Sequence, residues 1–111
     1  MAEQAPLPPP NPYGPSVGRL RGASGDHAVR GTSEHRVGRD PAHCAIVLSE
    51  PRVSGVHATL KMDVGSVWVR DESSNNGTWV QGARIAPGVW NVVPAGSSLR
   101  FGPVEFTVTV E

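Results

Sequence analysis

The chain has 111 residues, with ten basic and ten acidic side chains and a formal net charge of zero. This length allows one domain with a core large enough for independent stability. The charge balance argues against bulk electrostatic attraction to nucleic acid or to an anionic membrane. A single cysteine, Cys44, excludes an intramolecular disulfide and a multi-cysteine zinc cluster. No apolar run approaches the ~20 residues that cross a bilayer, and no signal sequence is visible, so we expect a cytoplasmic protein.

Residues 1–16 differ in composition from the rest of the chain. Six of the eleven prolines lie within them. Proline lacks a backbone donor and favours extended conformations, so we predict a flexible tail or linker there, followed by one domain over residues 17–111. A ligand for proline-binding modules is the alternative interpretation, although the segment lacks flanking charges.

From residue 17 onward the pattern is that of short β-strands. Apolar and β-branched runs are separated by glycine, proline, asparagine or aspartate, and no window of a dozen residues has helical periodicity. Repeated strands at spacings of about ten residues predict a β-sandwich or a closed barrel. Trp68, Trp79 and Trp90 lie beside valines, so we expect them to pack in the core or on sheet faces rather than to stack on nucleic-acid bases. The predicted strands are 17–23, 34–37, 45–48, 56–62, 67–69, 78–80, 83–85, 89–93, 98–101 and 104–110.

Three polar motifs fall at the ends of predicted strands. They are Gly38-Arg39, Ser54-Gly55-Val56-His57 and Asn76-Gly77-Thr78. An arginine offers a planar fork of donors that suits phosphate, and hydroxyl and carboxamide groups add hydrogen bonds to an oxyanion. The motifs therefore favour anion binding over catalysis, at loops on one rim of a β-fold.

Each motif also has a structural interpretation. Arg39 could be a surface arginine paired with Asp40, and Asn76-Gly77 is a strong hairpin signal because both residues tolerate positive φ. Ser54 and His57 invite comparison with a nucleophile and its base, but the glycine pattern of a nucleophile elbow is missing. We expect instead that His57 is buried, with its ring nitrogens bonded to backbone groups.

The order and spacing of the three motifs resemble the forkhead-associated (FHA) family, in which Gly-Arg precedes Ser-x-x-His and then Asn-Gly-Thr with an aromatic residue. The matching segments are Val37-Gly38-Arg39-Asp40, Val53-Ser54-Gly55-Val56-His57-Ala58 and Ser74-Asn75-Asn76-Gly77-Thr78-Trp79-Val80. The likeness extends over residues 17–110. It implies an all-β fold, a two-sheet β-sandwich of about eleven strands of the FHA/SMAD-like type, with the binding loops at one end.

The resemblance also implies an adaptor without catalytic activity that recognises phosphothreonine in partner proteins, and hence a Ser/Thr kinase that makes the ligand. Carried over, the phosphopeptide-binding residues are Arg39 and Ser54 on the phosphate, Asn75 at a further phosphate position, Asn76 on the ligand backbone, and Arg52, Gly55 and Ser74 around them. Gly38, His57 and Gly77 would shape the loops. Arg52 either reads an acidic residue at the third position after the phosphothreonine or is a solvated surface arginine.

Two departures from the family pattern concern the grip on phosphate. Gly55 stands where the family often has a basic or polar residue, and Asn75 stands where it often has a threonine or serine. These departures motivate the alternative function, a degenerate domain that makes phosphate-independent contacts with proteins or oligomers. For either function we expect a monomer, no cofactor, no metal, and no nucleic-acid or membrane partner.

Overall fold

The computed structural model describes residues 17–111, so the predicted proline-rich tail at 1–16 lies outside the described residues. The described part contains eleven β-strands and no helix, and hence no helix that could span a membrane. The strands are β1 (Val17–Gly22), β2 (Gly25–Arg30), β3 (His35–Gly38), β4 (Ile46–Val47), β5 (Ala58–Asp63), β6 (Ser66–Asp71), β7 (Thr78–Val80), β8 (Ala83–Arg84), β9 (Asn91–Val93), β10 (Ser98–Phe101) and β11 (Val104–Val110).

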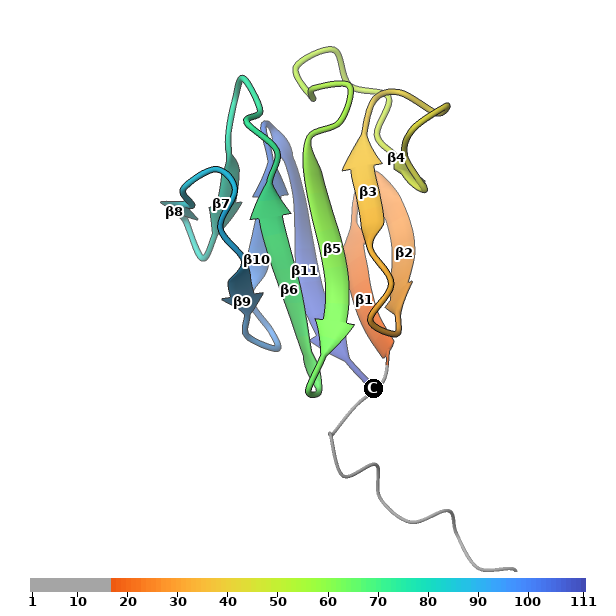
Figure 1. Ribbon diagram of the computed structural model, residues 1–111, viewed down its shortest axis with the longest axis vertical. Coiled ribbons are helices and arrows are strands. Elements are labelled where there is room, and N and C mark those ends of the chain that lie inside the picture. Colours follow the sequence, from red (N-terminus) through yellow and green to blue (C-terminus); the bar gives the residue numbers. More distant parts are fainter. Residues whose placement is uncertain (1–16) are drawn as a thin grey trace, which may run out of the picture.

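These strands form two sheets that pack face to face (Figure 1). One has six strands in the order β2-β1-β11-β10-β7-β8, and the other has five in the order β4-β3-β5-β6-β9. Neighbouring strands are antiparallel except for β3 and β4, where Val37 lies opposite Ile46 in a parallel pair. The two-sheet β-sandwich expected from the sequence is confirmed.

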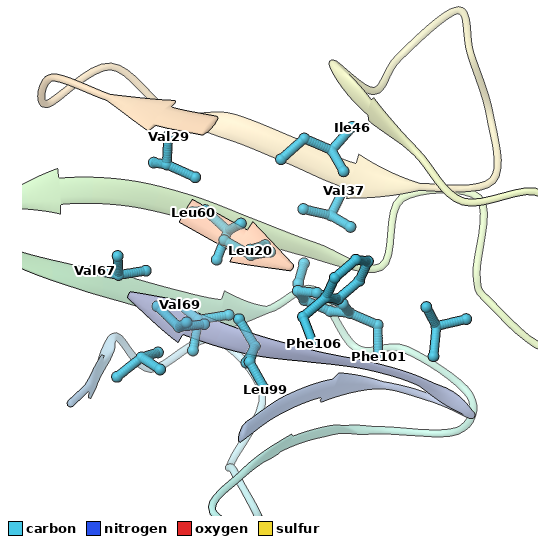
Figure 2. Packing of buried hydrophobic residues seen from close by; sticks show 14 of the residues in the cluster. Leu20, Val29, Val37, Ile46, Leu60, Val67, Val69, Leu99, Phe101 and Phe106 are labelled. Carbon is cyan, nitrogen blue, oxygen red and sulfur yellow. The ribbon is translucent and has the colours of Figure 1, made fainter. Parts of the chain in front are cut away.

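Alternating side chains build the core between the two sheets. In β11, Val104, Phe106 and Val108 are buried, whereas the intervening Glu105 and Thr107 face solvent. Figure 2 shows Phe106 beside Phe101 among aliphatic side chains from both sheets, and the two rings meet edge to face at 6.1 Å. This core fixes the strands whose ends carry the polar motifs.

The sequence-based prediction of strands was incomplete, because it lacked β2. That strand begins with glycine, aspartate and histidine, and only Val29 in it is completely buried. Because β2 lies at the edge of its sheet and pairs only with β1, one buried apolar side chain is enough to anchor it.

The hairpin interpretation of Asn76-Gly77 was wrong. These residues connect β6, in the five-stranded sheet, to β7, in the six-stranded sheet, so the loop crosses from one layer of the sandwich to the other. Gly77 has a φ of 81°, which explains the need for glycine at this crossing. The same end of the sandwich receives the loops after β3 and before β5, which Figure 1 shows at the top of the molecule.

Candidate anion-binding site

Loops 39–45, 48–57 and 72–77 surround a shallow depression of about 260 Å³ at this end of the sandwich. Its lining residues are Arg39, Pro51, Arg52, Val53, Ser54, Gly55, Asn75 and Asn76. The structure thus brings together six of the seven residues predicted to bind the ligand. Ser74 is the exception, whereas Pro51 and Val53 line the depression without having been predicted.

Arg39 supplies the positive charge of the depression. Its backbone N–H donates to the Ser54 carbonyl at 3.0 Å, and its Nη1 donates to the Pro51 carbonyl at 2.9 Å, which orients the guanidinium toward the second loop. Within residues 17–111, Arg39 takes part in no ion pair. Its other N–H groups and its charge are therefore available to an anion.

Asp40 does not pair with Arg39, contrary to the structural interpretation of that arginine. One carboxylate oxygen of Asp40 accepts from the N–H of Ala42 at 2.9 Å, and the other lies 2.6 Å from Nδ1 of His43. The hydrogen bond from His43 and then that from Ala42 hold the pKa of Asp40 below its usual range. Asp40 is thus an ionised group that stabilises its own loop.

Ser54 presents its hydroxyl group to the same depression. The Oγ atom accepts a hydrogen bond of 3.1 Å from the backbone N–H of Asn75. Because that bond uses a lone pair of the oxygen, the hydroxyl proton remains free, and no described residue accepts it. Ser54 can therefore donate to an oxyanion while Asn75 holds its oxygen in place.

His57 is completely buried beneath the depression and has both ring nitrogens engaged. Nδ1 accepts from the backbone N–H of Ser54 at 3.1 Å, so the proton is on Nε2, which donates to the Gly77 carbonyl at 2.8 Å. Burial lowers the pKa of His57 and favours this neutral form. Neither nitrogen can take the hydroxyl proton of Ser54, so the pair is not a nucleophile with its base.

Asn76 lies at the boundary of the depression with its side chain partly engaged. Its Nδ2 donates to the Arg52 carbonyl at 2.7 Å. The carboxamide oxygen and the second N–H have no partner within residues 17–111. One acceptor and one donor are thus available together, the pair that an extended peptide backbone needs.

Ser74 is placed away from the depression. It is 8% exposed, and its hydroxyl donates to Asp71 Oδ1 at 2.5 Å. Asp71, itself buried, also accepts from the Ser74 N–H at 3.1 Å and from the Thr78 hydroxyl at 2.7 Å. Sequence reasoning treated Ser74 as a ligand contact because the motif places it beside Asn75, but its hydroxyl is committed to holding loop 72–77.

Arg52 faces the depression but is already partnered. Its Nε lies 2.9 Å from Glu50 Oε1, and its side chain is 69% exposed. The Glu50 carboxylate also accepts from the Arg52 backbone N–H, and its pKa is lowered mainly by the side-chain bond from Arg52. Much of the Arg52 charge is therefore compensated, which leaves Arg39 as the main cation of the site.

Gly38 allows the first two loops to approach each other. A Cβ atom at this position would lie 2.2 Å from the Gly55 carbonyl oxygen and 2.9 Å from Cys44 Sγ. Cys44 is buried, and its thiol donates to the same carbonyl at 3.2 Å. Burial raises the thiol pKa, so Cys44 is a structural residue behind the site. Residues 17–111 contain no cluster of His, Cys, Asp or Glu that could hold a metal ion.

Comparison with known proteins agrees with this arrangement of loops. The family model of the FHA domain matches residues 35–102, which is more than half of the chain. The chain belongs to the forkhead-associated (FHA) family. The match contains all three motifs and the strands that carry them.

Relatives of this FHA domain occur in proteins of different organisms. The E3 ubiquitin-protein ligase rnf8 of Danio rerio is 37% identical over 84 residues, a match that covers 67% of this chain and 17% of the ligase. The FHA domain of CT664 from Chlamydia trachomatis has a TM-score of 0.77 and 25% identity, over 86% of this chain and 99% of that one. EmbR of Mycobacterium tuberculosis, solved in complex with a low-affinity phosphopeptide, has a TM-score of 0.75 and 28% identity. The match covers 86% of this chain and 25% of the EmbR chain.

Proposed function

We propose that this FHA domain is a phosphopeptide-binding module that recognises phosphothreonine in partner proteins. The observation that carries the proposal is the convergence of the unpaired Arg39 guanidinium and the free Ser54 hydroxyl on one depression. Both are donors, and a phosphate group offers three acceptor oxygens with a charge of about −1.5 to −2 at neutral pH. The EmbR structure, a similar fold in complex with a phosphopeptide, supports the proposal that this fold binds phosphopeptides.

The site divides into two tasks. Arg39 and Ser54 bind the phosphate, with Asn75 beside them, because their donors face the depression from adjoining loops. Asn76 holds the ligand backbone through its carboxamide oxygen and its second N–H, because only one N–H of this side chain donates to the Arg52 carbonyl. Gly38, His57 and Gly77 set the loop geometry without contacting the ligand.

The affinity is limited by the number of donors. A charge-assisted hydrogen bond contributes about 1.5–3 kcal/mol, and this site has one uncompensated arginine with a few neutral donors. Gly55 adds no side-chain donor where the family often has one. A dissociation constant in the micromolar range, about −8 kcal/mol, is therefore the expected limit.

Arg52 adds a preference for an acidic residue at the third position after the phosphothreonine. Its exposed guanidinium lines the depression beside the phosphate donors. Because Glu50 competes for the same guanidinium, the preference is weak in the wild type and increases in Glu50→Gln. The preference is tested by measuring the affinities of peptides with Asp, Ala or Lys at that position for the wild type and for Glu50→Gln. Equal affinities of the three peptides in both proteins would refute the preference.

Calorimetry with an oriented phosphothreonine peptide library tests the main proposal, against unphosphorylated and phosphoserine versions. We expect binding only with phosphate, a preference for phosphothreonine, and loss of binding in Arg39→Ala and Ser54→Ala. Arg36→Ala is the matched control, because Arg36 is an exposed arginine of the strand that precedes Arg39 and does not line the depression. Binding that is indifferent to phosphate and to Arg39→Ala would support the phosphate-independent alternative instead.

A further inference from the structure

Two arginines outside the depression, Arg84 and Arg100, flank Trp79 on the outer face of the six-stranded sheet. Trp79 is the Cα partner of Arg100 in β10 and of Arg84 in β8, so the sheet register itself groups the three side chains. The Arg100 Cζ lies 4.4 Å from the centroid of the indole ring, and the Arg84 Cζ lies 5.9 Å from it. Both guanidinium groups are thereby held against one aromatic side chain.

This group is attached to the loop that carries Asn76. The indole Nε1–H of Trp79 donates to the Asn76 carbonyl at 3.2 Å. A Cβ atom built on Gly77 would lie 2.6 Å from Arg84 Nε, so the guanidinium packs directly on the backbone of the residue after Asn76. The two arginines therefore lie beside the residue proposed to hold the ligand backbone.

Neither arginine has its charge compensated within residues 17–111. The Arg100 side chain donates one hydrogen bond, from Nη1 to the Gly102 carbonyl at 2.7 Å, and the Arg84 side chain donates none to these residues. Glu105 is the Cα partner of Arg100 in β11, yet the two form no ion pair. A guanidinium that stacks on a ring keeps its in-plane N–H groups free for an anion, so these two remain capable of binding one.

We propose that Arg84 and Arg100 form a second anion subsite, which reads an acidic or phosphorylated side chain of the same ligand. The proposal rests on the proposed function, because the ligand must first be held at Arg39, Ser54 and Asn76. A peptide that continues from the phosphate past Asn76 reaches β7 and β8 next. An extended chain advances about 3.3 Å per residue, so the anionic residue lies within a few positions of the phosphothreonine.

A peptide scan tests the second anion subsite. The probe is a peptide with a central phosphothreonine in an alanine-serine background, in which Glu, phosphoserine or Lys replaces each neighbouring residue in turn. Affinities are measured by fluorescence anisotropy for the wild type, Arg84→Gln, Arg84→Lys, Arg100→Gln, Arg52→Gln and Arg30→Gln. Arg30 is the matched control, because it is an exposed arginine of the same sheet at the end of β2 that lies away from the binding loops.

At one position we expect Glu to increase affinity about two- to fivefold over Ala, as for an exposed ion pair, and phosphoserine to increase it about tenfold. Arg84→Gln and Arg100→Gln should abolish the increase, Arg84→Lys should retain part of it, and Arg30→Gln should retain all of it. An increase at the third position after the phosphothreonine that depends on Arg52 belongs to the separate preference described above. The proposal would be overturned if no position gave an increase that depends on Arg84 and Arg100. Since the parent peptide is measured in the same assay, its binding separates failure of the second anion subsite from failure of the proposed function.

Discussion

The Nε2 atom of His57 donates a hydrogen bond of 2.8 Å to the carbonyl oxygen of Gly77, twenty residues further along the chain. This bond ties loop 48–57 to loop 72–77, the two loops that carry Ser54 and Asn76. The proposed phosphate-binding hydroxyl of Ser54 and the proposed backbone anchor Asn76 are therefore positioned relative to each other by a buried side chain that does not reach the depression.

Replacing His57 with alanine should reduce both stability and ligand binding. The change opens a cavity against Phe101, whose ring meets the imidazole edge to face at 5.9 Å. It also leaves the Ser54 N–H without a partner and removes one of the two hydrogen bonds that the Gly77 carbonyl accepts, the other coming from the Gly102 N–H. We expect the free energy of unfolding in urea to fall by about 3 kcal/mol. Phosphopeptide affinity, measured where the variant is still folded, should fall at least tenfold. His43→Ala, at an exposed histidine, should change stability by less than about 1 kcal/mol.

The stability of the domain should depend on pH through His57. Its folded-state pKa lies below the value of about 6.5 in the unfolded chain, because burial penalises the imidazolium form. The unfolded state therefore binds more protons below this value, so this contribution is complete above about pH 6.5 and is lost as the pH falls. Urea unfolding between pH 7.5 and about pH 5 should show the decrease.

His57→Gln provides the comparison for the pH experiment, because it removes the titrating group and keeps a polar side chain. Its free energy of unfolding should have a smaller slope over the same pH range. If this variant does not fold, NMR titration of the His57 imidazole in the wild type reports the same quantity. A His57 pKa at or above about 6.5 in the folded protein would contradict the expectation.

Gly38→Ala should separate the first two loops. The new Cβ would lie 2.2 Å from the Gly55 carbonyl oxygen, a contact that cannot exist without backbone movement. Since the bond from the Arg39 N–H to the Ser54 carbonyl lies beside it, we expect urea unfolding to show a loss of about 2–3 kcal/mol in stability. Calorimetry should show a large loss of phosphopeptide affinity.

Gly55→Ala is the matched control for Gly38→Ala. A Cβ on Gly55 meets only the Cβ of Asp40, at 4.0 Å, so the same chemical change has room. Stability should change by less than about 1 kcal/mol. Equal losses in the two variants would mean that the close approach at Gly38 does not control the loop geometry.

Side-chain chemistry made much of the site predictable. Arg39, Ser54 and Asn76 have donors that suit an oxyanion and follow or precede recognisable strands, and all three line the depression. Pro51 and Val53 were both missed. Pro51 contributes a backbone carbonyl that accepts from Arg39, and no side-chain pattern in the sequence marks such a carbonyl. Such contacts become visible only when two loops are placed together.

Other features depended on partners distant in the sequence. Asn76-Gly77 has the composition of a hairpin, but whether the next strand joins the same sheet is decided by core packing. β2 was missed because an edge strand with one completely buried residue has almost no periodic signal. Ser74 looked like a ligand contact because the buried acceptor that takes its hydroxyl, Asp71, could not be recognised as buried from its position alone.

Asp71→Asn should destabilise loop 72–77. The carboxylate accepts three hydrogen bonds, from the Ser74 N–H, the Ser74 hydroxyl and the Thr78 hydroxyl, whereas an asparagine has only one oxygen to accept them. An amide that turns its oxygen to the Ser74 N–H can donate from its NH₂ to the two hydroxyl oxygens, but the three charge-assisted hydrogen bonds then become neutral ones, which are weaker. We expect a loss of about 2 kcal/mol in urea unfolding, and faster amide exchange at Ser74.

Asp63→Asn is the matched control for Asp71→Asn, because Asp63 lies at the end of β5 and its carboxylate makes no hydrogen bond to residues 17–111. Only its backbone carbonyl accepts from a side chain, that of Trp68. Its stability should stay within about 0.5 kcal/mol of the wild type. If Asp71→Asn were equally mild, the buried carboxylate would not be what orders the loop.

Gly55→Lys should strengthen phosphopeptide binding. Gly55 lines the depression beside Ser54, and the space around its missing side chain is open. A lysine there adds a second cation next to the proposed phosphate position, and an exposed ion pair should increase affinity about fivefold at low salt. Gly55→Gln, which has similar reach without charge, should give little increase. Because the gain is electrostatic, it should also shrink as ionic strength rises toward about 1 M, where the screening length falls to about 3 Å. An affinity for Gly55→Lys equal to that of Gly55→Gln would show that the phosphate does not lie beside Gly55.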